Sequence, residues 1–184
     1  MEPTMTTEVL LVNGEMLIGK VTKPFIQDGK LMGAVLSFEG RSETALLHRK
    51  QMVGANKNTR LSNTQLGAEM LVRIIVSGEQ PDRKVWASEL TVDNEFLIER
   101  IKTAPKVMTS TVINSTDYGV FVEVQEGPAA GRRGLIHAKN LGTRSGPVRL
   151  GAFTSYETGA SVQVRLLNAS VDGKGVLRLD LAVN

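Results

Sequence analysis

The stretch Gly67-Ala-Glu-Met-Leu-Val-Arg-Ile-Ile75 recurs later in the chain as Gly159-Ala-Ser-Val-Gln-Val-Arg-Leu-Leu167. Upstream of it, Ala45-Leu-Leu-His48 matches Gly134-Leu-Ile-His137, so the only two histidines occupy matching places. Further upstream, Gly19-Lys-Val21 matches Ser110-Thr-Val112 more weakly. The three offsets are 92 (67 to 159), 89 (48 to 137) and 91 (21 to 112). Three blocks in the same order predict a duplicated domain whose loops differ in length.

Short strands account for the apolar pattern of both halves. The run from Ser161 to Leu166 alternates apolar and polar residues, which is typical of a strand with one buried face. Asp28-Gly29 and Asp172-Gly173 are typical of tight hairpin turns. The predicted strands are 16–23, 32–38, 43–48, 69–77 and 83–90 in the first half, and 107–115, 118–125, 133–137, 161–169 and 176–183 in the second.

This pattern predicts an all-β chain of two tandem five-stranded OB-type β-barrels, each with a long connection between its third and fourth strands. The predicted parts are an N-terminal extension (1–14), a first barrel (15–92), a linker (93–106) and a second barrel (107–184). Asp93 is a candidate cap for a short linker helix over 94–102. Such a helix could be a rigid spacer or could pack on a barrel.

Composition narrows the class of protein. The chain of 184 residues has no cysteine, which excludes disulfides and zinc–thiolate sites. No basic segment precedes the first apolar run, and the run 70–76 is too short to span a bilayer, so a cytoplasmic protein is expected. Residues 106–184 hold nine basic and six acidic residues, whereas residues 1–105 hold thirteen of each. Because Lys and Arg contact phosphates, the second half is the expected nucleic-acid binder.

Tyr118-Gly-Val-Phe-Val122, Gly134-Leu-Ile-His137 and the strand that begins at Gly159 follow one another in the second half. Together they resemble the signature of the RNA-binding domain named after ribosomal protein S-one, the S-one domain. The resemblance covers residues 107–184 and extends more distantly to the first half, through 46–48 and 67–75. It implies an OB fold that binds single-stranded RNA.

The resemblance also implies a set of RNA-binding residues. Tyr118, Phe121 and His137 would form an exposed platform for base stacking. The candidate phosphate contacts are Arg132, Arg133, Lys139, Arg144, Arg149 and Arg165. In ideal pleating Tyr118 and Phe121 would fall on opposite faces, and Gly119 could permit a bulge that re-aims one of them. The alternative is that Phe121 belongs to the core and the arginines are solvated surface.

Two family positions differ in the second half. Members of the family often have an aspartate late in the fourth strand and an arginine early in the fifth. In this chain the aligned residues are Ser170 and Val176, and Asp172 and Arg178 lie nearby but out of register.

The first half differs further, because Met32-Gly-Ala-Val35 replaces the aromatic strand. It keeps His48, Arg49 and Lys50 as candidate RNA contacts, and Trp86 on the last strand is expected in the core, with a base platform as the alternative. This barrel is therefore either a weak RNA binder or a protein-contact surface.

The expected function is non-enzymatic binding of single-stranded RNA, associated with mRNA, translation or the ribosome, mainly through the second barrel. The alternative is an accessory subunit of a ribosome, polymerase or RNA-degradation complex that uses the barrels as a scaffold. No catalytic residue, metal, cofactor or small-molecule substrate is expected, because the sequence has neither a phosphate-cradling Gly-rich motif nor a nucleophile–base constellation.

Overall fold

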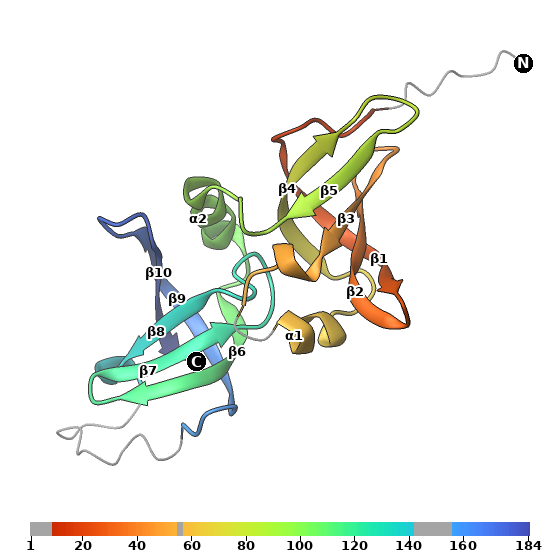
Figure 1. Cartoon of the computed structure of the whole chain (residues 1–184). Coiled ribbons are helices and arrows are strands. Elements are labelled where there is room, and N and C mark those ends of the chain that lie inside the picture. The colour runs from red at the N-terminus through yellow and green to blue at the C-terminus, as the bar shows by residue number, and fades with distance from the viewer. Residues whose placement is uncertain (1–8, 55–56, 142–155) are drawn as a thin grey trace, which may run out of the picture. The chain divides into compact units, whose positions relative to one another are not determined.

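Two closed five-stranded β-barrels follow one another along the chain (Figure 1). The computed structural model describes residues 9–54, 57–141 and 156–184. The chain divides into two compact units, of which the first holds β1 to β5 with α1 and the second holds α2 with β6 to β10. The predicted all-β fold class is thus confirmed.

The first barrel has the strand order β1-β2-β3-β5-β4 and is closed by antiparallel pairing of β1 with β4. The pairing of β3 with β5 is parallel, and the other neighbouring strands are antiparallel. Its elements are β1 (Met16–Gln27), β2 (Lys30–Phe38), β3 (Thr44–His48), the 3-10 helix η1 (Arg49–Gln51), α1 (Lys57–Asn63), β4 (Glu69–Ser77) and β5 (Lys84–Ser88).

The second barrel repeats this topology, with the strand order β6-β7-β8-β10-β9 and closure between β6 and β9. The parallel pair is here β8 with β10. Its elements are α2 (Asn94–Thr103), β6 (Val107–Thr116), β7 (Gly119–Val124), β8 (Arg133–His137), the 3-10 helix η2 (Ala138–Asn140), β9 (Ser161–Val171) and β10 (Leu177–Val183).

The predicted linker helix packs on the second barrel. Its buried face carries Leu97 and Ile101, and α2 contacts β9. The side-chain amide of Asn94 donates a hydrogen bond of 2.8 Å to the carbonyl oxygen of Gly175 in the β9–β10 connection. Of the two possibilities that the sequence left open for α2, the structure shows packing on a barrel.

One of the two predicted Asp-Gly hairpins is tight, and the other is wider than expected. Asp28 and Gly29 both have positive φ angles, 51° and 70°, as a two-residue hairpin turn requires. By contrast, β9 ends at Val171 and β10 begins only at Leu177. The carboxylate of Asp172 accepts hydrogen bonds from the backbone N–H groups of Lys174 and Val176, at 2.9 and 3.0 Å. These bonds stabilise the longer loop and explain why no two-residue turn forms there.

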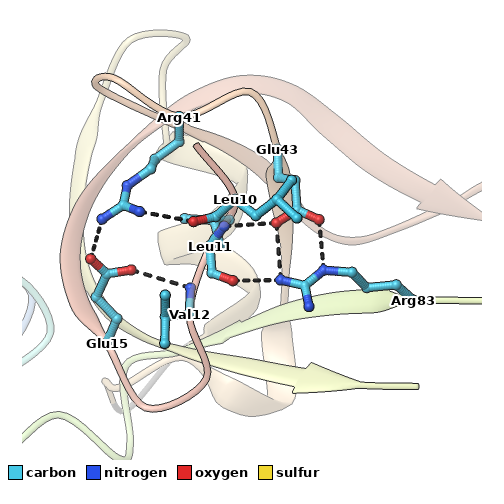
Figure 2. A network of polar contacts seen from close by, with 7 residues as sticks. All are labelled: Leu10, Leu11, Val12, Glu15, Arg41, Glu43 and Arg83. Atoms are coloured by element: carbon cyan, nitrogen blue, oxygen red, sulfur yellow. Dashed lines mark hydrogen bonds and ion pairs between the residues drawn. The ribbon is translucent and has the colours of Figure 1, made fainter. Parts of the chain in front are cut away.

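Residues 9–15 precede β1, and we call them the strap. Two arginine–glutamate pairs, Arg41 with Glu15 and Arg83 with Glu43, hold the strap on the first barrel (Figure 2). Leu11 in this strap is only 1% exposed and belongs to the barrel core. Its N–H donates to the carboxylate of Glu43 at 2.7 Å, and its carbonyl accepts from Arg83. Arg41 pairs with Glu15 and donates to the carbonyl of Leu10 at 2.8 Å. Because its N–H and its carbonyl are both hydrogen-bonded, the backbone of Leu11 is buried without leaving a polar group unpaired.

A buried ion pair fastens α1 to the end of β5. Arg60 and Glu89 are both almost fully buried, and the guanidinium contacts both carboxylate oxygens. The backbone N–H of Glu89 donates to the carbonyl of Gln51 at 2.9 Å, which joins η1 to the same corner. Removal of either charge would leave the other buried and uncompensated, so this corner depends on both residues.

Neither described helix has the length or the apolar composition needed to cross a bilayer, and the described part of the chain contains no other candidate.

The strap makes the stability of the first barrel sensitive to acid. Hydrogen bonding from Arg83 lowers the pKa of Glu43 below its usual value; the Leu11 N–H and the charge of Arg83 act in the same direction, and burial opposes them. A lowered carboxyl pKa stabilises the folded state above the ordinary glutamate pKa of about 4.3, and this contribution disappears as pH falls through the folded pKa. We therefore expect Glu43→Gln to destabilise the first barrel at neutral pH and to have progressively less effect in acid.

Urea unfolding followed by the fluorescence of Trp86 tests this, because Trp86 is the single tryptophan and lies in the first barrel. Glu39→Gln is the matched control, since Glu39 is exposed and should have little effect at any pH. A difference between Glu43→Gln and wild type that stays constant from neutral pH into acid would contradict the linkage.

Candidate nucleic-acid interface

Tyr118 and Phe121 meet at one end of the second barrel. Their ring centroids lie 5.9 Å apart, with an angle of 88° between the ring planes, which is an edge-to-face contact. Tyr118 lies in the turn between β6 and β7, and Gly119 begins β7. The expectation that the two rings fall on opposite faces fails because Tyr118 is not on the pleated strand. The turn directs its ring toward Phe121.

Phe121 lies on the outer face of β7. Its strand neighbours Val120 and Val122 are fully buried, whereas Phe121 itself is half-buried. Across the sheet Phe121 pairs with Asn114 of β6 and Leu135 of β8. Tyr118 is 49% exposed and Phe121 is half-buried, so both aromatic side chains are accessible to solvent. The alternative that Phe121 belongs to the barrel interior therefore does not fit its position.

The close approach of β7 and β8 brings His137 beside these rings. Gly119 pairs with His137, and a Cβ atom at Gly119 would overlap the carbonyl oxygen of Ile136. The backbone N–H of Ala138 donates to the carbonyl of Tyr118 at 2.8 Å, which ties the turn to the end of β8. Tyr118, Phe121 and His137 are thus brought to one edge of the barrel, and we call this group the aromatic platform.

His137 has a structural bond as well as an exposed ring. Its Nδ1 atom accepts a hydrogen bond of 3.3 Å from the backbone N–H of Lys139 and so caps η2. The side chain is exposed, as is that of Lys139 two residues later. The cap fixes the position of the ring and leaves its face available for contact.

The predicted phosphate contacts are less tightly grouped than the rings. Lys139 follows the platform directly, and Arg133 lies on the same outer face of β8 as Leu135 and His137. Arg133 pairs in register with Glu123, which is buried. Arg165 is exposed on β9, opposite Val107 and Ala182. Arg132 precedes β8 and makes interactions of its own, so it is not a free cation.

Two other predicted contacts, Arg144 and Arg149, lie outside the described residues.

The β9–β10 hairpin carries the two differing family positions. Ser170 pairs in register with Arg178, and Val176 directly precedes β10. Arg178 donates to Asp172 at 2.7 and 3.0 Å. Backbone hydrogen bonding from Val176, followed by the bond from Arg178, lowers the pKa of Asp172. The hairpin therefore has an aspartate and an arginine, but they are paired with each other.

The first barrel has the same strand geometry without the aromatic rings. Gly33 pairs with His48, and a Cβ atom at Gly33 would overlap the carbonyl oxygen of Leu47. The positions of Tyr118 and Phe121 are occupied by Met32 and Val35. The aromatic platform is thus specific to the second barrel.

His48 and the two basic residues after it form a capped turn. The Nδ1 atom of His48 accepts from the N–H of Lys50 at 3.2 Å, and Arg49 donates to Asn58 at 3.1 Å. Burial, followed by the charges of Lys50 and Arg49, lowers the pKa of His48. The neutral ring is the form that can accept the capping bond.

Trp86 lies at the surface of the first barrel. It was expected in the core, but it is 38% exposed and projects outward from β5, next to the buried Ala87. Its counterpart in the second barrel is Asp180, because Leu46 pairs with Trp86 as Leu135 pairs with Asp180. The charged Asp180 at the matching position could have indicated that Trp86 faces outward, because charged residues are rarely buried.

Among the described residues, no group of three or more His, Cys, Asp and Glu side chains could hold a metal ion.

The likenesses of this chain to known proteins reported below are weak. No protein-family model and no curated protein matches the chain. Among solved structures, a multidomain protein with nucleic acid binding domains from Streptococcus pneumoniae TIGR4 matches 97% of this chain at 15% identity and a TM-score of 0.41. The match covers 54% of that protein, so the chain spans about half of its length. An uncharacterized protein from Methanocaldococcus jannaschii matches 46% of this chain over its whole length, at 20% identity and a TM-score of 0.35. At these TM-scores neither likeness carries weight for function.

The close approach at Gly119 predicts a specific sensitivity of the second barrel. Gly119→Ala places a methyl group against the carbonyl of Ile136, and we expect destabilisation of about 1–3 kcal/mol, typical of overpacking. Gly173→Ala is the matched control, because its Cβ would meet no atom within 4 Å. We expect that control to be neutral or slightly stabilising. Thermal unfolding by circular dichroism measures both, and equal midpoints for the two variants would show that the approach does not constrain the barrel.

Proposed function

We propose that the protein is a non-enzymatic binder of single-stranded RNA that acts mainly through its second barrel. The observation that carries the proposal is the edge-to-face pair of Tyr118 and Phe121, 5.9 Å apart on the outer surface. Exposed rings held in fixed positions offer surfaces on which unpaired bases stack. Each such stack contributes about 1–3 kcal/mol to binding.

The surroundings of the platform suit a polyanion with exposed bases. Lys139 lies next to His137, and Arg133 lies on the same face of β8. The second half of the chain also holds the whole excess of positive charge, nine basic against six acidic residues. Basic side chains beside a stacking surface supply the contacts to phosphate that give affinity without sequence preference.

The preference for RNA rests on the resemblance to the S-one domain. Tyr118-Gly-Val-Phe-Val122 supplies two rings of the platform and Gly134-Leu-Ile-His137 supplies the histidine, so the quoted motifs and the geometry involve the same residues. We propose on this basis that the natural ligand is an mRNA or a single-stranded segment of ribosome-associated RNA. We propose no catalytic step, because the sequence offers no nucleophile–base constellation.

Removal of both aromatic rings tests the stacking model. We expect Tyr118→Ala with Phe121→Ala to weaken binding of a labelled oligouridylate by at least roughly tenfold, since two stacks of about 1 kcal/mol or more are lost. Fluorescence anisotropy measures the affinity, and a duplex of the same length should bind more weakly than the single strand.

The conservative double variant Tyr118→Phe with Phe121→Tyr is the control, because it keeps two rings and should keep most of the affinity. The stacking model is wrong if the double alanine variant unfolds at the wild-type temperature and still binds the oligonucleotide as tightly as wild type.

A further inference from the structure

An apolar row crosses the outer face of the first barrel. Val35 of β2 pairs with Leu46 of β3, Leu46 pairs with Trp86 of β5, and Trp86 pairs with Ile75 of β4. All four side chains are at least partly exposed, whereas their neighbours along the strands include the fully buried Leu36, Leu47, Ile74 and Ala87. Strand alternation therefore directs the row away from the core. We call these four residues the tryptophan row.

The matching row of the second barrel is built differently. Strand pairing there joins Phe121, Leu135, Asp180 and Asn168 in the same order of strands. Phe121 matches Val35, and Asp180 matches Trp86. The aromatic ring of the row therefore lies on the second strand in the second barrel and on the fifth strand in the first barrel.

The charges around the tryptophan row favour an anionic ligand. Lys84 lies two residues before Trp86 on the same face of β5, and it is exposed. Arg49 and Lys50 follow β3 directly. The one acidic residue at an outward position of the described parts of these four strands is Glu69, which lies six residues before Ile75 on β4 and pairs with Lys20 at 3.7 Å. The outward positions nearer the row are uncharged or basic: Gly33, Val35, Ser37, Thr44, Leu46, His48, Arg73, Ile75, Ser77, Lys84, Trp86 and Ser88. The matching positions in the second barrel include Glu123 and Asp180.

We propose that the tryptophan row is a second contact surface for single-stranded nucleic acid, on which a base stacks against Trp86 and Lys84 lies against an adjoining phosphate. The proposal rests on the proposed function, in that single-stranded nucleic acid would be the ligand of both barrels. An exposed indole is a large stacking surface, and neither the four row residues nor Lys84 brings a negative charge that would repel the strand.

Trp86 itself reports on the contact, because it is the only tryptophan in the chain. Titration of the full chain with oligouridylate should produce a saturable change in Trp86 fluorescence, since stacking alters the environment of the indole. The change should persist at higher oligonucleotide concentration in the Tyr118→Ala, Phe121→Ala variant, where the second barrel's rings are absent.

Substitution of Trp86 measures how much the indole contributes to the affinity for the oligonucleotide. In the Tyr118→Ala, Phe121→Ala background, Trp86→Ala should weaken binding by roughly 5- to 150-fold, the equivalent of one lost stack. Trp86→Phe should recover most of the loss because it restores a ring. Leu66→Ala is the matched control, since Leu66 is a 69% exposed apolar residue of the same barrel outside the row, and it should leave the affinity unchanged.

The possible failures are distinguishable. If the oligonucleotide binds but Trp86 fluorescence stays constant, and Trp86→Ala binds as tightly as its parent, this inference is wrong and the proposed function stands. The tryptophan row would then be a surface for a protein. If the wild-type chain shows no anisotropy change with any single strand, both the inference and the proposed function are wrong.

Discussion

The close approach of two strands at a glycine determines where the outer residues of each barrel lie. At Gly33 and at Gly119 the carbonyl of the neighbouring strand occupies the space of a Cβ atom, so a larger residue cannot hold this pairing. The partner on that neighbouring strand is a histidine in both barrels. Because a slip of one residue would move every side chain to the opposite face, this pairing fixes which residues face solvent.

The histidines extend the same constraint beyond the strands. Each one ends its strand and caps a 3-10 turn through Nδ1, with the backbone N–H of the residue two positions later as donor. The glycine and histidine therefore form one unit that sets the register and begins the next turn. Both barrels have this unit.

The two barrels share this strand pairing but differ in the residues on their outer faces. The second barrel has Tyr118 and Phe121 on its second strand and the turn before it, and Asp180 on its fifth. The first barrel has Val35 and Trp86 at the positions of Phe121 and Asp180. The two barrels thus share the backbone pairing and differ in the placement of rings and charges, so their outer faces offer a ligand different surfaces.

Much of the fold could be predicted because it depends on local patterns. Alternation along 161–166 and the repeated blocks predicted the ten strands and their arrangement in two similar halves. Asp28-Gly29 forms the tight turn that its sequence predicts, with a positive φ angle at both residues. The loop at Asp172 was not predictable from Asp-Gly alone, because the carboxylate bonds two N–H groups farther along the chain.

The candidate site was harder to predict because it depends on contacts between strands. The placement of Tyr118 in a turn, and not on the strand, decides that it meets Phe121. The pairing of Arg133 with Glu123 is set by strand register, which a linear pattern does not show. Trp86 was misassigned because tryptophan is usually buried, and only the match with Asp180 indicates that its position faces outward.

Nuclear magnetic resonance of tyrosine-labelled protein tests the central claim most directly, because the chain has only two tyrosines. Tyr118 lies in the aromatic platform, whereas the hydroxyl of Tyr156 donates to the carbonyl of Leu141 at 3.3 Å. With a saturating single-stranded oligouridylate, we expect the ring resonances of Tyr118 to shift strongly and those of Tyr156 to change little. Unchanged Tyr118 resonances in a sample that demonstrably binds the oligonucleotide would contradict base stacking on the second barrel.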